Sequence, residues 1–130
     1  MNVLVTGSAG HLGEALVRHL DQIGMNPVGL DIKQSDYTRY VGSITDPDFV
    51  DASMRGVDAV IHAATLHKPH VGTHSRQAFI DTNISGTLNL LEAAVRHGIG
   101  SFVFTSTTST FGDALRPAPG EPAVWVTETV

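Results

Sequence analysis

The chain has 130 residues, enough for one compact domain. Hydrophobic residues make up 42% of it and charged residues 16%, a balance typical of a folded globular domain and not of a disordered chain. It contains no cysteine, which excludes disulfides and thiolate metal sites. Its net charge of −5, without a cluster of lysine or arginine, argues against a nucleic-acid partner.

Nothing in the sequence predicts a membrane partner. No apolar run approaches the length of a membrane span. The first apolar segment is too short for a secretory signal and leads straight into glycines. We therefore expect a cytoplasmic protein.

Short apolar segments alternate with helical patterns along the chain. Strands are predicted at 2–6, 26–31, 39–44, 58–64 and 101–106, and helices at 11–24, 46–56 and 75–97. Asp46 is the expected N-cap of the second helix, followed by Pro47, and Gly98 is the expected end of the third. Strands separated by helices pair in parallel through right-handed crossovers, which predicts a doubly wound, Rossmann-like α/β sheet in the strand order 3-2-1-4-5.

Three glycines follow the first predicted strand in "TGSAGHLG". Gly7 would turn the chain sharply, Gly10 would let backbone approach a pyrophosphate, and Gly13 would let the helix lie close on the sheet. The start of that helix offers free N–H groups and the positive end of its dipole to phosphates. A tight turn without a ligand is the alternative, but a position between strand and helix favours a dinucleotide site.

Asp31 ends the second predicted strand, 18 residues after Gly13. This interval is close to that of an acid that binds the adenosine ribose. A carboxylate there would repel a 2′-phosphate, so NAD is favoured over NADP, although Lys33 could soften the repulsion. The alternative is a solvated turn residue.

Four motifs in order carry a family resemblance. They are "TGSAGHLG", "VIHAAT", "NISGTLNLLEA" and "FVFTSTTSTFG", and the resemblance that they carry covers essentially the whole chain. With them the sequence resembles the extended short-chain dehydrogenase/reductase group, the NAD-dependent epimerases and dehydratases that act mainly on nucleotide sugars. The resemblance implies NAD as cofactor, a nucleotide sugar as small-molecule substrate, and a homodimer for the full-length protein.

The resemblance also implies the site residues. Those expected to bind the cofactor are Gly7, Gly10, His11, Leu12, Gly13, Asp31, Ile32, Ser43, Ile44, Ala63, Ala64, Thr65, Asn83 and Thr105. Ser43 departs from the family, which has an aspartate there, and His67 stands where a lysine is common. Asn83 lies inside a predicted helix, where it would either face inward and orient the active site or simply face solvent.

The hydroxyl run after the fifth predicted strand would be a plain polar loop if taken alone. In the resemblance Thr107 falls at the catalytic Ser/Thr position, with Ser106 just before it, so these two are the expected catalytic residues. The family's base is the tyrosine of a Tyr-x-x-x-Lys pair, which neither Tyr37 nor Tyr40 forms. We therefore expect a dinucleotide-binding domain at 1–112. A loop-rich tail at 113–130 should lead to later strands, a base and a substrate domain that these residues lack.

Four histidines at positions 62, 67, 70 and 74 could be read as a metal site. No carboxylate lies inside that stretch and the spacing matches no ligand pattern, so a loop over the active site is favoured and no metal is predicted.

The functional hypothesis is the NAD-binding portion of an epimerase, dehydratase or related dehydrogenase that moves hydride to and from a carbinol, inactive as a separate polypeptide. Two alternatives stay open: a non-catalytic NAD-binding sensor or scaffold, and an NADP-linked carbonyl reductase on the same scaffold.

Overall fold

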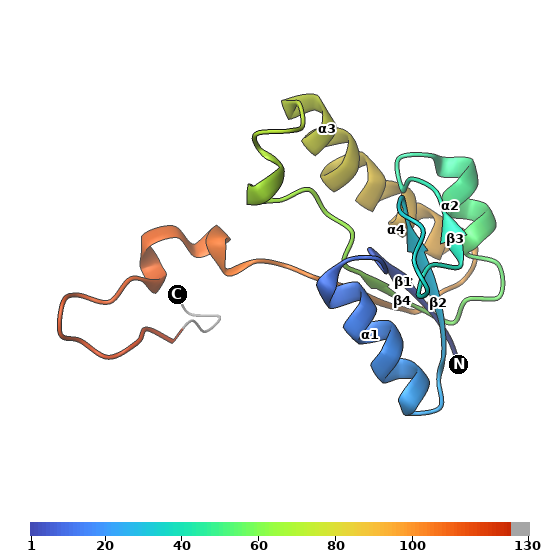
Figure 1. Cartoon of the computed structure of the whole chain (residues 1–130), viewed down its shortest axis with the longest axis horizontal. Coiled ribbons are helices and arrows are strands. Elements are labelled where there is room, and N and C mark those ends of the chain that lie inside the picture. The colour runs from blue at the N-terminus through green and yellow to red at the C-terminus, as the bar shows by residue number, and fades with distance from the viewer. Residues whose placement is uncertain (126–130) are drawn as a thin grey trace.

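A parallel five-stranded sheet with helices on both faces forms the body of the molecule in the computed structural model (Figure 1). The structure describes residues 1–125, apart from the side chains of residues 108–110 and 114. The strand order is β3-β2-β1-β4-β5, which confirms the predicted doubly wound sheet. The strands are β1 (Asn2–Thr6), β2 (Asn26–Asp31), β3 (Tyr40–Val41), β4 (Ala59–His62) and β5 (Ser101–Phe104). The α-helices are α1 (His11–Gln22), α2 (Pro47–Ser53), α3 (Arg76–Ile80) and α4 (Gly86–Arg96).

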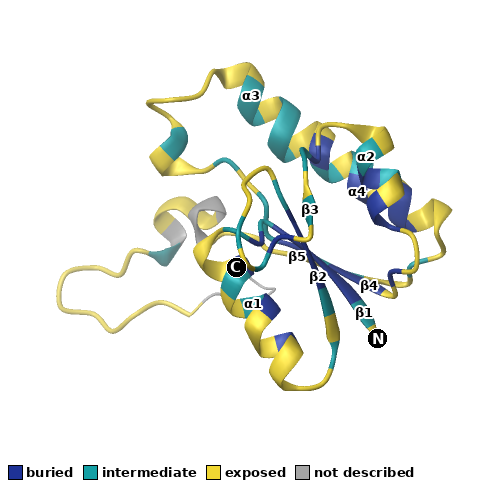
Figure 2. Ribbon diagram, turned by 45° about the vertical axis from the view of Figure 1, so that its right-hand side comes forward, coloured by how far each residue is buried: buried dark blue, intermediate teal, exposed yellow. Residues whose placement is uncertain are grey.

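Each face of the sheet has its own apolar cluster. On one face Val3 and Val5 of β1 pack with Val17 and Leu20 of α1. On the other face strand residues pack against α2 and α4, and this larger cluster comprises Leu4, Val28, Leu30, Ile44, Val50, Met54, Val57, Val60, Leu90 and Ala93. The central strands are therefore buried from both sides, as Figure 2 shows, which explains their continuous apolar runs.

The start of α2 agrees with the sequence pattern. The Asp46 side chain accepts hydrogen bonds from the backbone N–H groups of Asp48 and Phe49, both at 3.1 Å, and Pro47 opens the helix. The predicted third strand is too long, because β3 covers only Tyr40–Val41. After it the Ser43 carbonyl accepts from Asp46 N–H at 3.1 Å, so the chain turns into α2 and leaves the sheet.

The predicted long helix is one continuous helical run with an irregular centre. Ser75 caps it, accepting from Ala78 N–H at 3.1 Å, and Gly98 ends it with a φ of 68°. Between α3 and α4 the stretch Asp81–Ser85 forms a π-helical turn, in which Gly86 N–H donates to the Asp81 carbonyl five residues earlier. Such single turns inside α-helices are frequent at functional sites.

The chain from Thr105 onwards leaves the body (Figure 1). The sequence predicts a strand up to Ser106 and mostly loop after it, but β5 ends at Phe104 and Thr108–Leu115 forms 3₁₀ turns on either side of Gly112. The division into a domain at 1–112 and a tail at 113–130 stays a prediction, and positions 126–130 lie outside the described residues. None of the helices in the described part is long and apolar enough to cross a membrane.

Candidate cofactor site

The loop after β1 is held between the ends of two neighbouring strands. The N–H groups of Gly7 and Ser8 donate to the Leu30 carbonyl of β2 at 2.8 and 3.3 Å. Gly7 has a φ of 77°, and a Cβ there would lie 2.9 Å from the Ala64 nitrogen beyond β4. Glycine is therefore required at position 7 both for the turn and for the close approach.

The other two glycines of the motif shape the start of α1. Gly10 is the N-cap, and a Cβ there would lie 3.2 Å from the Gly7 carbonyl oxygen, a tight contact that needs only a small local adjustment. A Cβ at Gly13 would collide with the Gly7 carbonyl oxygen and lie 2.9 Å from the Ser8 Cα. The helix thus packs at Gly13 on the loop, and not on the sheet as the sequence predicted.

The N-terminus of α1 presents donors without protein acceptors. Gly10 makes no side-chain cap bond, and the first α1 amide with an acceptor is that of Glu14, which donates to the Gly10 carbonyl at 2.8 Å. Among the described residues no acceptor bonds the N–H groups of His11, Leu12 and Gly13. Three such donors at the positive end of a helix dipole suit an anion, and the side chains of His11 and Leu12 are exposed beside them.

Asp31 stands at the end of β2 next to this loop. Its Oδ2 accepts from Ala9 N–H at 3.0 Å, and its Oδ1 accepts from Lys33 N–H at 2.9 Å. A carboxylate has about four acceptor positions, so both oxygens retain capacity for ribose hydroxyls. Ile32 beside it is 64% exposed and presents an apolar side chain at the same edge.

Ser43 and Ile44, both expected to bind the cofactor, lie in different surroundings. The Ser43 hydroxyl lies 2.8 Å from the Thr45 hydroxyl, at the partly exposed turn before α2. Ile44 is only 4% exposed and packs where Gly86 has no side chain, since a Cβ there would lie 2.6 Å from Ile44 Cγ1. The Ile44 side chain is therefore core, which leaves only its backbone to face a cofactor. Gly86 is explained by this contact with Ile44 and not by contact with the sheet.

The segment after β4 is tied to both β1 and the π turn. Ala63 and Ala64 donate their N–H groups to the Thr6 hydroxyl at 3.2 and 3.1 Å. The Asn83 side chain accepts from Leu66 N–H and donates to the Leu66 carbonyl, both at 2.8 Å, and it also accepts from the Thr65 hydroxyl at 3.1 Å. Asn83 thus faces inward, and the solvent-facing alternative is wrong.

His62 is the polar residue that sequence reasoning left without a role. It lies in β4, is only 2% exposed, and places its ring nitrogens 2.7 Å from the Thr6 hydroxyl and 2.9 Å from the Thr87 hydroxyl. Burial lowers the pKa of its imidazole to about 4. The available signal was a histidine inside the apolar run "AVIHAA", where a polar group needs partners.

The expected catalytic hydroxyls follow β5. Thr105 N–H donates to the His62 carbonyl at 3.0 Å, which extends the pairing of β4 and β5 by one bond. Thr105, Ser106 and Thr107 are exposed at the carboxyl edge of the sheet, where parallel strands bring them near the end of β4. Their roles stay predictions.

The loop histidines contact one another edge to face. The rings of His67 and His70 have centroids 4.9 Å apart, those of His70 and His74 are 5.4 Å apart, and His67 N–H donates to His70 Nδ1 at 3.0 Å. Within the described part of the chain no group of three histidine or carboxylate side chains is placed to hold a metal ion.

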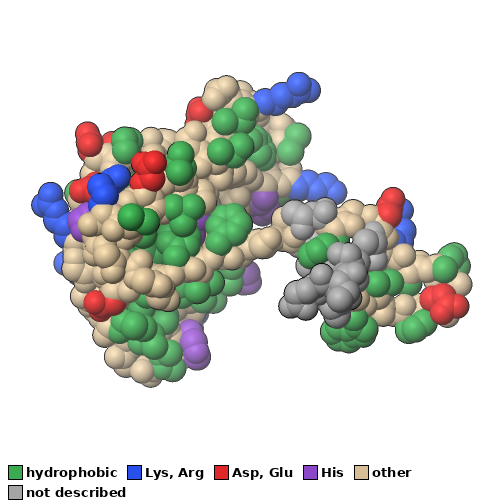
Figure 3. Space-filling view, turned by 180° about the vertical axis from the view of Figure 1, so that it is seen from behind, with side chains coloured by type: hydrophobic (Ala, Val, Ile, Leu, Met, Phe, Trp, Pro, Cys, Tyr) green, Lys and Arg blue, Asp and Glu red, His purple; other side chains and the backbone are tan. Residues whose placement is uncertain are grey.

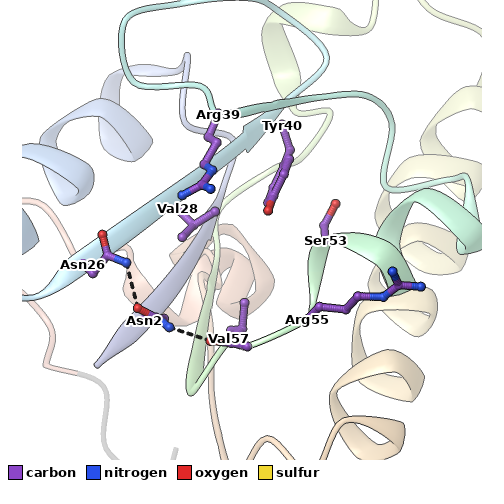
Figure 4. Close-up of a pocket in the computed structure, with 9 residues that line it drawn as sticks. Asn2, Asn26, Val28, Arg39, Tyr40, Ser53, Arg55 and Val57 are labelled. Atoms are coloured by element: carbon purple, nitrogen blue, oxygen red, sulfur yellow. Dashed lines mark hydrogen bonds between the residues drawn. The ribbon is translucent and has the colours of Figure 1, made fainter.

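Two cavities in the described part of the chain lie elsewhere. One of about 170 Å³ sits at the amino-terminal edge of the sheet, where Asn2 and Asn26 are hydrogen-bonded beside Arg39 and Tyr40 (Figure 4). The other, of about 300 Å³, is largely apolar and lies where Val71 and the other residues of its loop meet α3. Neither is the predicted cofactor site, which is an open edge formed by the loop, Asp31 and the segment after β4.

The comparisons with known proteins agree with this arrangement. The model of the NAD dependent epimerase/dehydratase family matches residues 3–126. The chain is 34% identical to a dTDP-glucose 4,6-dehydratase of Streptomyces antibioticus over 86% of its own length and 39% of the relative's. It is 33% identical to a UDP-glucose 4-epimerase of Rhizobium meliloti (strain 1021), over 85% of the chain and 37% of that relative.

Among solved structures, a short-chain dehydrogenase/reductase superfamily protein of Agrobacterium tumefaciens with bound NAD superposes with a TM-score of 0.79 at 31% identity. The match covers 88% of this chain and 35% of that one. The chain therefore spans less than two fifths of the length of these proteins. The fold, the loop after β1 and the family match together show that the chain belongs to the NAD-dependent epimerase/dehydratase family.

Proposed function

We propose that this chain is the NAD-binding portion of a sugar-nucleotide epimerase, dehydratase or related dehydrogenase. The observation that carries the proposal is the set of three N–H groups at the start of α1 that no acceptor in the described part of the chain bonds, with the Asp31 carboxylate beside them. The N–H groups would hold the pyrophosphate of NAD, and Asp31 would accept from the adenosine ribose hydroxyls. The segment Ala63–Thr65 would line the cofactor from the other side of the loop.

The chemistry follows from the edge at which these groups meet. Bound NAD would supply a hydride acceptor for a substrate carbinol. The Thr107 hydroxyl would hydrogen-bond the substrate oxygen, with Ser106 next to it, because both are exposed at the carboxyl edge of the sheet. Neither tyrosine stands four residues before a lysine, so we propose that the base comes from outside these 130 residues and that they alone are inactive.

A nucleotide sugar is the proposed substrate. Both named relatives act on one, dTDP-glucose in the dehydratase and UDP-glucose in the epimerase. Because the chain spans only part of either relative, the substrate and the activity belong to the whole protein in this proposal. A cytoplasmic location is part of the same proposal.

An apolar stripe along the α3–α4 run supports a homodimer. Its residues are between 43% and 80% exposed, and they recur every three or four positions so that they share one side of the helix. They are Ile80, Ile84, Leu88, Leu91 and Val95. Further hydrophobic side chains gather on the face of the body from which the tail leaves (Figure 3). Contiguous exposed apolar surface of this kind marks an interaction site, and a second copy of the chain is the proposed partner.

The test is calorimetric titration of the chain with NAD and with NADP. We expect binding of NAD and weaker binding of NADP; absence of NAD binding would overturn the proposal. Equal or tighter binding of NADP would favour the reductase. The longer protein should turn over a nucleotide sugar, and NAD binding without any turnover there would favour a sensor or scaffold.

A further inference from the structure

His62 is joined through hydrogen bonds to two elements that border the candidate site. On one side Nδ1 lies 2.7 Å from the hydroxyl of Thr6, the residue before Gly7. On the other side Nε2 lies 2.9 Å from the hydroxyl of Thr87, one turn beyond Asn83. The imidazole, which belongs to β4, therefore links β1 to α4.

The partners determine where the protons lie. The Thr6 oxygen already accepts from the N–H groups of Ala63 and Ala64, so its own proton is available to His62 Nδ1. The Thr87 hydroxyl donates to the Asn83 carbonyl at 2.8 Å, so it can only accept from His62. His62 is thus assigned as the neutral tautomer with its proton on Nε2, and both ring nitrogens are satisfied.

The surroundings of His62 keep it neutral. The rings of Phe102 and Phe104 lie 6.2 and 5.5 Å from the imidazole, centroid to centroid, and Thr6 and Thr87 are its polar neighbours. Among the described residues no charged side chain bonds it or shifts its titration. Burial alone holds the pKa of the imidazole to about 4, so the same bonds persist at neutral pH.

Through Thr87, His62 is connected to the π turn Asp81–Ser85 between α3 and α4. Asn83 lies in the π turn, its carbonyl accepts from Thr87, and its side chain brackets both backbone groups of Leu66. A shift of this turn would move the Asn83 amide away from Leu66 and release Thr65, whose hydroxyl donates to the same amide.

We propose that His62 is a positioning residue: by donating from Nε2 to Thr87 it fixes the π turn, so that Asn83 clamps Leu66 and holds the segment after β4 along the cofactor edge. The consequence for NAD rests on the function proposed above. The positioning of Leu66 does not, because it concerns contacts within the chain alone.

The two ring nitrogens allow matched variants. The side-chain amide of glutamine reaches the place of Nε2, whereas that of asparagine reaches only the place of Nδ1. His62→Gln should therefore keep the bond to Thr87, and His62→Asn should lose it. Thr87→Val removes the same bond from the other side, together with the Thr87 bond to the Asn83 carbonyl, while preserving the shape of the side chain.

Hydrogen exchange at neutral pH measures the clamp directly. In His62→Asn and Thr87→Val, exchange of the Leu66 amide should speed up roughly tenfold more than that of Val5, which is buried in β1, since a buried polar group loses its partner. His62→Gln should keep the ratio of the two rates. The affinity for NAD should fall in parallel in the first two variants.

The same rates can overturn the inference. If Leu66 and Val5 speed up equally, His62 supports only global stability. If His62→Gln loses as much as His62→Asn, the bond to Thr87 is not the link. A selective loss at Leu66 with unchanged NAD affinity would support the positioning role and count against the proposed cofactor contact of Thr65.

Discussion

The carboxylate of Asp31 accepts a hydrogen bond from the backbone N–H of Ala9, with 3.0 Å between Oδ2 and nitrogen. This bond ties the end of β2 to the middle of the loop after β1. The residue proposed to choose between NAD and NADP thus also helps to shape the loop proposed to bind their phosphates.

Replacing Asp31 by asparagine should change cofactor choice more than fold. We expect NAD to bind roughly tenfold more weakly, because a charge-assisted hydrogen bond contributes about 1.5–3 kcal/mol. NADP should lose less, because the carboxylate that repels the 2′-phosphate is gone. The measurement is the ratio of the two dissociation constants, with Asp36→Asn on the neighbouring exposed turn as control. An unchanged ratio in Asp31→Asn would show that Asp31 does not face the ribose.

Gly7→Ala should destabilise the fold more than Gly24→Ala. Both glycines have nearly the same positive φ, 77° and 78°, so the backbone penalty of about 1–2 kcal/mol is shared. Only at Gly7 would the new Cβ meet Ala64, whereas nothing lies within 4 Å at Gly24. Urea unfolding should place Gly7→Ala at least about 1 kcal/mol below Gly24→Ala. Equal losses of unfolding free energy in the two variants would mean that the ends of β1 and β4 move apart to accommodate the new Cβ at little cost.

Gly10→Ala should weaken NAD binding with little loss of stability. The residue has a φ of −88°, which alanine adopts readily, and its new Cβ would face the Gly7 carbonyl oxygen at 3.2 Å. The methyl group would occupy space that a pyrophosphate needs beside the start of α1. Calorimetry should show a clear drop in affinity for Gly10→Ala. Gly100→Ala, with nothing within 4 Å, should bind as the parent chain does, and matching affinities of the two variants would contradict the assignment.

Acid should destabilise the protein through His62. Burial lowers the pKa of its imidazole to about 4 from an ordinary value near 6.5, so the unfolded chain binds more protons between these values. The free energy of unfolding should therefore fall by about 3 kcal/mol as the pH drops from 6.5 to 4, and stay level in this respect below 4.

His62→Gln supplies the control, because it cannot titrate. The hydrogen bond from Arg96 holds the pKa of the Asp51 carboxyl below its usual value, so its stabilisation is lost only at still lower pH. Urea unfolding at pH 7 and pH 4.5 should show a smaller decline for His62→Gln than for the parent. If the free energy of unfolding fell equally in His62→Gln and in the parent, groups other than His62 would cause the acid sensitivity.

Leu88→Asp should dissociate the proposed homodimer of the full-length protein. Leu88 is 52% exposed at the centre of the apolar stripe, and a carboxylate there would be costly to bury between two copies. Sedimentation should show a shift towards monomer. Ile23→Asp is the control, since Ile23 is 53% exposed at the end of α1, on the opposite face of the sheet from α4, and a dimer that survives Leu88→Asp would exclude this surface.

The sequence alone determined the sheet order and the glycine loop between β1 and α1. Its glycine spacing, its cap at Asp46 and its apolar strand runs are local signals, and each depends on residues close together in the chain. The loop after β1 is another such local signal. Its position between a strand and a helix and the family match both indicate the same glycine motif.

Tertiary structure decided what depends on contacts between distant residues. Gly13 packs on the loop, the Ile44 side chain enters the core, and Asn83, which lies in a π turn, bonds both backbone groups of Leu66. The pairing of His62 with Thr6 and Thr87, 56 and 25 residues away, leaves no periodic signal in the sequence. Buried polar groups must find partners, but only the folded chain determines which ones lie within reach.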